Sequence, residues 1–319
     1  MLRQGLLWLS QQNGVFNFVR SNPLARRFAE RFVAGETIEQ GVAAAVEMHQ
    51  RGITSSLDLL GESVTQADEA TAARDEYLAM LDRMAAAGSV EVNVSVKLTQ
   101  MGFDIDEDLC RRNMVAILEK ARALGGFVRL DMEGSDYTQR TLDFFRNRLY
   151  EPYGAHCGVV IQSMLRRSEQ DIEDLITLGA RVRLCKGAYL EPPSVAFPDK
   201  ADVDRNYVKL MHRLLAEGNY PGLATHDERI IGQAREFAGR ERIGNDRYEF
   251  QMLYGVRRDL QARLRRAGHH MRVYIPFGTQ WYPYLMRRLA ERPANIAFIL
   301  GNLVRESVPG RARPGRSEG

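Results

Sequence analysis

Four side chains near the C-terminal end of the chain could together hold a small carboxylate. Tyr284, Arg287, Arg288 and Glu291 follow one another at three- and four-residue intervals. Residues at these intervals share a helix face, so the four groups can project together. A guanidinium fork matches the two oxygens of a carboxylate. The pattern therefore predicts a carboxylate clamp, with a solvated helix face as the alternative.

The composition is typical of a globular protein and excludes several classes of function. Of the 319 residues, 45% are hydrophobic and 27% are charged. The net charge of +3 is too small to indicate nucleic-acid binding. The 3 cysteines include no CxxC pair, which argues against a disulfide framework or a metal site and favours a reducing cytoplasm. No apolar run approaches the roughly 18 residues that a membrane-spanning helix requires.

Runs rich in β-forming residues alternate with stretches of helical periodicity through most of the chain. This alternation predicts an α/β fold with a parallel sheet, and eight such units fit a (β/α)₈ barrel. A doubly wound open sheet is the alternative, which the lack of a GxGxxG motif after the first strand weakens. The predicted strands are 53–60, 90–98, 127–132, 158–164, 180–186, 222–226, 248–253 and 271–275.

The elements predict three parts along the chain. Residues 1–50 have helical character, broken at Asn22-Pro23, and form an N-terminal helical segment that we expect to pack on the barrel. Residues 51–304 form the barrel itself. Residues 305–319 are rich in proline, glycine and arginine, which predicts a disordered tail.

Alternation within the strands predicts which side chains point into the barrel. In residues 90–97, valines alternate with polar residues that end at Lys97, and three later strands alternate in the same way. The apolar face must pack on the outer helices, so the polar face points inward. This places four side chains inside, near the strand ends where barrel active sites lie: Lys97, Asp131, Arg183 and Tyr274. We expect Lys97 and Asp131 to pair, which keeps both charged, with a structural polar core as the alternative.

Six segments together resemble the proline dehydrogenase family. They are Leu-Leu-Gly-Glu at 59–62, Val-Ser-Val-Lys-Leu at 94–98, Arg-Leu-Cys-Lys-Gly-Ala-Tyr at 183–189, Ala-Thr-His-Asp at 224–227, Glu-Phe-Gln at 249–251 and the clamp segment 284–291. The size is similar to that of the monofunctional bacterial members. The resemblance implies a distorted (β/α)₈ TIM-like barrel that binds FAD non-covalently. It also implies oxidation of L-proline to Δ1-pyrroline-5-carboxylate, with electrons passed to a quinone.

The resemblance implies a role for each matched residue. The substrate carboxylate would be bound by Lys97, Arg287 and Arg288, and the substrate ring would pack between Tyr274 and Tyr284. Asp131 would orient Lys97, Arg183 would lie near the flavin N5 atom, and Glu62 would pair with Arg287 as a gate. The implied FAD contacts are Met132, Gln162, Arg183, Lys186, Gly187, Ala188, Tyr189, Thr225 and His226.

The implied partners are L-proline, a quinone and a separate pyrroline-5-carboxylate/glutamate-semialdehyde dehydrogenase, with no nucleic acid and no metal. The implied location is the cytoplasm, with peripheral contact to the inner membrane as an option. One alternative is a Schiff-base barrel aldolase that uses Lys97 or Lys186, although an adjacent Asp131 would keep Lys97 charged and unreactive. Another alternative is a non-catalytic barrel that binds an amino acid.

Overall fold

The computed structural model describes residues 30–291, and side chains as far as residue 286. The chain divides into two compact units, one of residues 30–281 and one of residues 1–29 together with 282–319. The first unit contains the barrel. In the second, only residues 282–291 are described, as part of helix α13 (Trp281–Glu291). The predicted tail 305–319 lies outside the described residues, and the predicted boundaries at 50 and 304 remain predictions.

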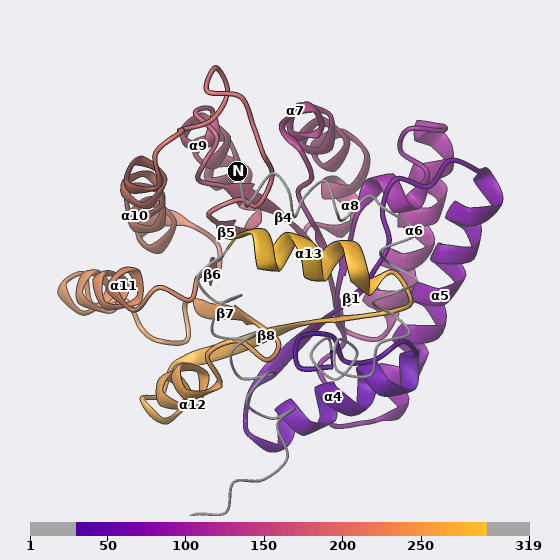
Figure 1. The fold of residues 1–319 in the computed structure, drawn as a ribbon, viewed down its shortest axis with the longest axis horizontal. Helices are drawn as coiled ribbons and strands as arrows, with labels where there is room; N and C mark the ends of the chain where they lie inside the picture. Colours follow the sequence, from indigo (N-terminus) through magenta and orange to yellow (C-terminus); the bar gives the residue numbers. More distant parts are fainter. Residues whose placement is uncertain (1–29, 292–319) are drawn as a thin grey trace, which may run out of the picture. The chain divides into compact units, whose positions relative to one another are not determined.

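Eight parallel strands close into a barrel in chain order, β1 to β8 (Figure 1). Residues 54–59 of the first strand pair with residues 272–277 of the last, which closes the sheet. Every predicted strand overlaps an observed one, so the barrel prediction is confirmed. The strands are β1 (Thr54–Leu59), β2 (Asn93–Val96), β3 (Phe127–Leu130), β4 (Cys157–Gln162), β5 (Arg181–Cys185), β6 (Gly222–Ala224), β7 (Glu249–Leu253) and β8 (His270–Phe277).

Helices follow the strands in sequence and surround the barrel (Figure 1). The α-helices of this unit are α4 (Ile38–Gln50), α5 (Ala67–Ala86), α6 (Glu107–Ala123), α7 (Ser135–Phe144), α8 (Glu151–Tyr153), α9 (Ser168–Leu178), α10 (Lys200–Glu217), α11 (Glu228–Arg240) and α12 (Arg258–Arg266). The described residues also include a 3₁₀-helix, η1 (Leu98–Met101), and a π-helix, η2 (Phe145–Tyr150). Within residues 30–291, no helix is long and apolar enough to span a membrane.

The described part of the N-terminal segment becomes helical only at Ile38. Thr37 and Gln40 form a capping box, in which each side chain accepts a hydrogen bond from the other residue's backbone N–H. Gly35, at φ +105°, lies outside the helix in a conformation that favours glycine. Helix α4 then packs against β1 and β8, with Val42, Ala45 and Met48 buried in the main core.

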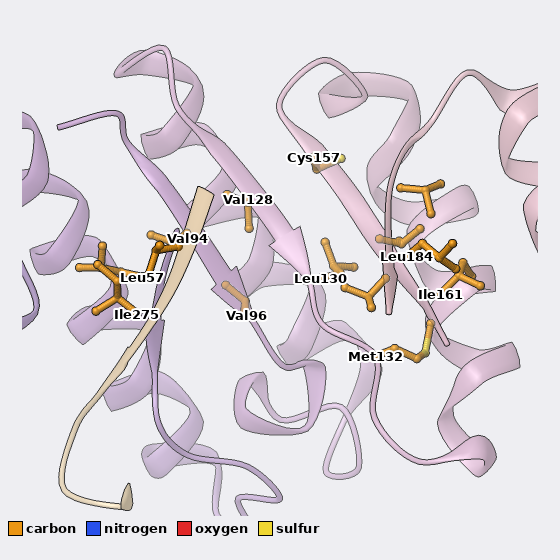
Figure 2. Packing of buried hydrophobic residues seen from close by; sticks show 14 of the residues in the cluster. Leu57, Val94, Val96, Val128, Leu130, Met132, Cys157, Ile161, Leu184 and Ile275 are labelled. Carbon is orange, nitrogen blue, oxygen red and sulfur yellow. The ribbon is translucent and has the colours of Figure 1, made fainter. Parts of the chain in front are cut away.

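The outer faces of the strands are apolar, as the alternation predicts. Val94, Val96, Val128 and Leu130 are fully buried in the hydrophobic layer that the strands share with the helices (Figure 2). Burying one such side chain stabilises the fold by roughly 1.5–3 kcal/mol. This layer leaves the alternate, inward positions free to carry polar groups.

The barrel interior is filled by polar and charged side chains, and glycines make room for them. The Arg129 guanidinium crosses the interior, where Nη1 donates to the carbonyl oxygens of Arg181 at 2.6 Å and Val159 at 3.2 Å. Gly158, on the strand between, has no side chain to obstruct this contact. A Cβ atom there would lie 2.6 Å from Nη1 of Arg129 and 2.3 Å from the Arg181 carbonyl oxygen.

We expect Gly158→Ala to destabilise the protein, by about 1–3 kcal/mol or more, because the added methyl group overlaps backbone that cannot move freely. The free energy of unfolding in urea measures this effect. Gly232→Ala is the matched control, because a Cβ at this position in α11 meets nothing within 4 Å. The control should stabilise the helix by about 0.5–1 kcal/mol. Equal effects of the two variants would contradict the close approach at Gly158.

Candidate active site

Two of the inward-pointing residues expected to carry chemistry lie at the C-terminal ends of their strands, and the other two lie within their strands. Lys97 directly follows β2, and Asp131 directly follows β3. Arg183 lies within β5 and Tyr274 within β8. Parallel strands of a closed barrel bring these ends to one rim. Residues far apart in the sequence can therefore share one site.

Asp131 brings Arg183 and Tyr274 together. Its Oδ1 atom accepts a hydrogen bond from Nη1 of Arg183 at 2.8 Å, and its Oδ2 atom accepts one from the Tyr274 hydroxyl at 2.7 Å. The guanidinium carbon of Arg183 lies 5.2 Å from the centre of the Tyr274 ring. The predicted inward orientation of these three side chains is confirmed. The Tyr274 phenol is neutral, since burial and the neighbouring Asp131 both raise its pKa.

Two further hydrogen bonds fix the Arg183 guanidinium across the barrel. Nε donates to Oε1 of Gln251 on β7 at 2.5 Å, and Nη1 donates to Oγ of Ser95 on β2 at 3.2 Å. The side chain thus contacts groups from β2, β7 and the end of β3. An arginine held by partners on several strands is pre-organised, because little of its conformational freedom remains to be lost when it binds a ligand.

The expected pairing of Lys97 with Asp131 is wrong. Lys97 Nζ instead lies 3.2 Å from Oδ1 of Asp58 on β1. The physical reason is that Asp131 is already paired with the Arg183 guanidinium, whereas the buried charge of Asp58 favours the approach of a cation. Lys97 therefore turns to the carboxylate on its other side.

Lys97 stays charged in this environment. Burial alone would lower its pKa, but the nearby carboxylates of Asp58 and Asp131 outweigh burial, so its pKa is raised. A Schiff-base nucleophile requires a neutral amine at working pH. The raised pKa of Lys97 therefore counts against the aldolase alternative at this residue.

Asp58 is a site residue that the sequence reasoning missed. Its side chain is 1% exposed, and Oδ2 is buried without a hydrogen-bond partner among the described residues. Burial raises the pKa of Asp58, and the adjacent Lys97 opposes that rise. The signal was present in the strand Thr-Ser-Ser-Leu-Asp-Leu, where Ser56 and Asp58 alternate with Leu57 and Leu59.

The expected FAD contacts occupy a continuous arc of the same rim, from β3 to β6. Met132 follows Asp131 and is buried, and Gln162 ends β4, where its Nε2 donates to the Glu133 carbonyl oxygen at 2.9 Å. Thr225 and His226 follow β6. The backbone N–H of Leu253 donates to Nε2 of His226 at 3.0 Å, which places the proton of a neutral imidazole on Nδ1.

The segment after β5 contributes the remaining expected FAD contacts. Lys186 Nζ lies 2.6 Å from Asp204 and 3.2 Å from Asp227. Gly187 adopts φ +103°, and a Cβ atom there would lie 2.4 Å from Sδ of Met164. Ala188 and Tyr189 are half-buried, and Tyr189 packs against a small apolar cluster of Met164, Leu165 and Ala196.

The predicted clamp is described only in part. Tyr284 lies in α13, and the helix runs on through Arg287 and Arg288, so the helical spacing of the three residues is confirmed. The side chains of Arg287 and Arg288 lie outside the described residues. Glu62 follows β1 and is half-buried, and its predicted pairing with Arg287 stays a prediction.

Comparison with known proteins gives a consistent result. The sequence profile of the family described as proline dehydrogenase matches residues 42–300. Proline dehydrogenase of Deinococcus radiodurans is 45% identical over 280 residues, which are 87% of this chain and 90% of that protein. Proline dehydrogenase 2 of Bacillus subtilis strain 168 is 39% identical over 308 residues, which are 95% of this chain and 99% of that protein.

Solved structures agree with the sequence comparison. The crystal structure of proline utilization A (PutA) from Bdellovibrio bacteriovorus, inactivated by N-propargylglycine, superimposes with a TM-score of 0.79 at 25% identity. The match covers 89% of this chain but 34% of that chain, so this chain spans about a third of the length of the larger protein.

Proposed function

The chain belongs to the proline dehydrogenase family, and we propose that it oxidises L-proline to Δ1-pyrroline-5-carboxylate with non-covalently bound FAD as the hydride acceptor. The observation that carries this proposal is the convergence of Asp131, Arg183 and Tyr274 on one another at the barrel rim, beside the Lys97–Asp58 pair. Such a gathering of cations, acids and a phenol suits an anionic substrate and an anionic cofactor.

The rim divides into two arcs that suit these two molecules. The barrel residues proposed for the substrate follow β1 and β2 or lie within β8, and those proposed for FAD lie in or directly after β3 to β6. Asp131 and Arg183 lie on the second arc and reach Tyr274 on the first. Asp131 and Arg183 are therefore well placed to position the substrate against FAD.

The residues on the second arc fit a flavin nucleotide. Arg183 offers a fixed cation, and Gly187 has no side chain to crowd the rim. Thr225 and His226 are polar groups that can form hydrogen bonds. Lys186 is shared by Asp204 and Asp227, so contact with a phosphate would draw it from one of them. Gln162 and Met132 would contact the ring system, and Ala188 and Tyr189 would border it. When bound, FAD supplies the N5 atom that accepts the hydride.

The residues on the first arc would bind and orient proline. Lys97 is charged and would bind the substrate carboxylate together with Arg287 and Arg288. Tyr274 is held by Asp131 and would border the ring, with Tyr284 on the other side. Glu62 would close the site by pairing with Arg287. Three cations around one carboxylate would fix its orientation and neutralise its charge.

The remaining partners belong to the same proposal. Electrons would pass from the reduced cofactor to a quinone, which brings the cytoplasmic enzyme into peripheral contact with the inner membrane. The imine product would pass to a separate pyrroline-5-carboxylate/glutamate-semialdehyde dehydrogenase. Together these steps form the first stage of proline catabolism to glutamate.

The visible spectrum of the purified protein tests the proposal. We expect a yellow protein with flavin absorbance that is bleached by L-proline in the absence of oxygen and restored by a soluble quinone. N-propargylglycine, which inactivated the B. bacteriovorus protein, should inactivate this protein in a proline-protectable manner. A colourless protein that is trapped by borohydride with a ketone would favour the aldolase. A colourless protein that binds proline without turnover would favour the binding barrel.

A further inference from the structure

Asp58 is a buried carboxylate whose surroundings supply few proton donors. One oxygen pairs with Lys97, and the other, Oδ2, is buried without a hydrogen-bond partner among the described residues. The Tyr274 hydroxyl has one proton, and it donates that proton to Asp131. Buried carboxylates are normally satisfied by several donors, because an unpaired buried charge is unfavourable. The charge of Asp58 therefore depends mainly on Lys97.

Lys97 in turn depends on Asp58 for its charge and its orientation. A lysine ammonium is a compact charge on a flexible stem, with three donors and no fixed direction of its own. The Lys97 side chain is 11% exposed, so burial favours its neutral form unless a carboxylate lies close. The bond to Asp58 uses one donor and fixes the direction of the ammonium group. Among residues 30–286, whose side chains the structure describes, the other two donors have no recorded partner and can serve a ligand.

We propose that Asp58 is a positioning residue for Lys97, one that keeps the ammonium group charged and aimed at the carboxylate of the bound substrate. The proposal rests on the proposed function, because it assigns Lys97 to the substrate carboxylate. It replaces the expected orienting role of Asp131 with a residue on a different strand. Asp131 instead holds Arg183 and Tyr274.

Asp58→Asn tests this role, because it preserves the shape of the side chain and removes its charge. We expect KM for proline to rise by about tenfold or more, the effect of losing one charged hydrogen bond, with flavin content unchanged. The ratio of the variant's KM to that of the wild type should grow further as pH rises. Asp131, Glu62 and Tyr189 also favour the charged form of Lys97 and remain in the variant. Asp58 makes the largest of these contributions, so without it Lys97 loses its proton at lower pH than in the wild type.

Glu91→Gln is the matched control. It removes the exposed carboxylate that pairs with the buried Arg272, at the opposite end of the strands from Lys97. This variant should leave KM for proline and its pH dependence at the wild-type values. A similar rise of KM in both variants would show a general effect of removing a carboxylate from this barrel and would overturn the proposal.

Double variants separate positioning from a structural role. If Asp58 acts through Lys97, Asp58→Asn should add little to KM in a Lys97→Met background. In a Lys97→Arg background it should produce no pH-dependent rise, since arginine stays charged. If Asp58→Asn multiplies KM by the same factor in all backgrounds, the inference is overturned.

If the asparagine variant fails to fold, Asp58→Glu should raise KM without added pH dependence, and an unchanged KM in that variant would also overturn the inference. A wild-type protein without flavin or proline turnover would refute the proposed function instead.

Discussion

Arg183→Met is expected to lower kcat per bound flavin by about a hundredfold or more, the scale seen when a pre-organised charged donor is removed from an active site. The methionine retains much of the length of the side chain but removes every contact to Asp131, Gln251 and Ser95. Asp131 would keep the Tyr274 hydroxyl as a donor but lose its ion-pair partner. We therefore also expect a loss of stability of about 3–5 kcal/mol, typical of breaking a buried ion pair.

Arg181→Met is the matched control for this prediction. Arg181 lies two positions earlier on the same strand and faces the same interior, but at the opposite end of the barrel. Its guanidinium carbon lies 4.4 Å from the centre of the Phe127 ring and 4.6 Å from that of Tyr220. The control should lose stability but retain kcat per bound flavin. Steady-state kinetics with flavin quantification and urea unfolding distinguish the two variants. Similar kcat values in both would contradict the catalytic placement of Arg183.

The alternation of eight β-rich runs with helical stretches predicted the barrel, and the alternation of residue types within the strands predicted the inward side chains. In β2 the outward valines had to pack on helices, so Ser95 and the following Lys97 had to point inward. The same logic placed Arg183 and Tyr274 correctly. These predictions succeed because strand geometry fixes which face each residue occupies, independently of what lies opposite.

The partners of those inward side chains could not be predicted in the same way. Which residues meet across a barrel depends on its closure and on competition among all interior groups. Lys97 and Asp131 follow neighbouring strands, yet Asp131 forms its ion pair with Arg183 from β5. The small residues that permit such crossings, such as Gly158 under Arg129, have no distinguishing sequence pattern.

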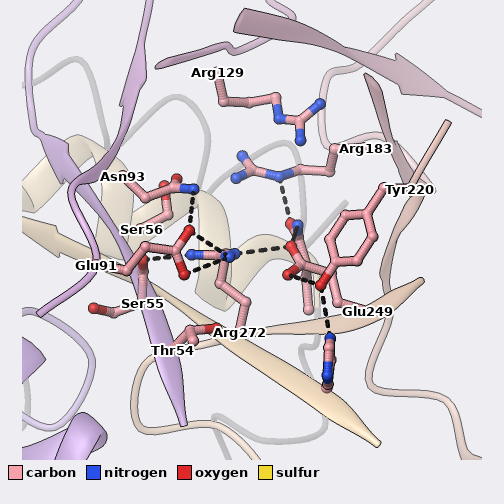
Figure 3. A network of polar contacts seen from close by, with 12 residues as sticks. Thr54, Ser55, Ser56, Glu91, Asn93, Arg129, Arg183, Tyr220, Glu249 and Arg272 are labelled. Atoms are coloured by element: carbon pink, nitrogen blue, oxygen red, sulfur yellow. Dashed lines mark hydrogen bonds and ion pairs between the residues drawn. The ribbon is translucent and has the colours of Figure 1, made fainter. Parts of the chain in front are cut away.

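Glu249 is a buried carboxylate whose ion pair and hydrogen bonds stabilise the folded protein. It is 3% exposed, and its Oε1 atom accepts from Nε of Arg272 at 2.8 Å (Figure 3). The same atom accepts from Nε2 of Gln251 at 2.6 Å. Arg272 in turn pairs with Glu91 at 3.0 Å. Burial alone would raise the pKa of Glu249, but Arg272 and these hydrogen bonds lower it to about 2.

Glu249→Gln is therefore expected to destabilise the protein by about 3 kcal/mol at pH 7, the free energy equivalent of its lowered pKa. The lowered pKa also sets the direction of the pH dependence. The contribution of Glu249 is fully present above the unfolded pKa, which lies near 4.5, and is lost as pH falls toward the folded value of about 2. The stability difference between wild type and variant should shrink by about 1.4 kcal/mol between pH 7 and pH 3.5.

Urea unfolding of both proteins at the two pH values measures this difference. Glu241→Gln serves as the control, because Glu241 pairs with Arg240 on the exposed surface, where an ion pair contributes at most about 1 kcal/mol. A stability difference for Glu249→Gln that stays constant down to pH 3.5 would mean that packing of the amide, and not the carboxylate charge, causes the loss. A difference that shrinks as expected would locate a large part of the acid sensitivity of this barrel in its interior, at the N-terminal end of β7, where Glu249 lies.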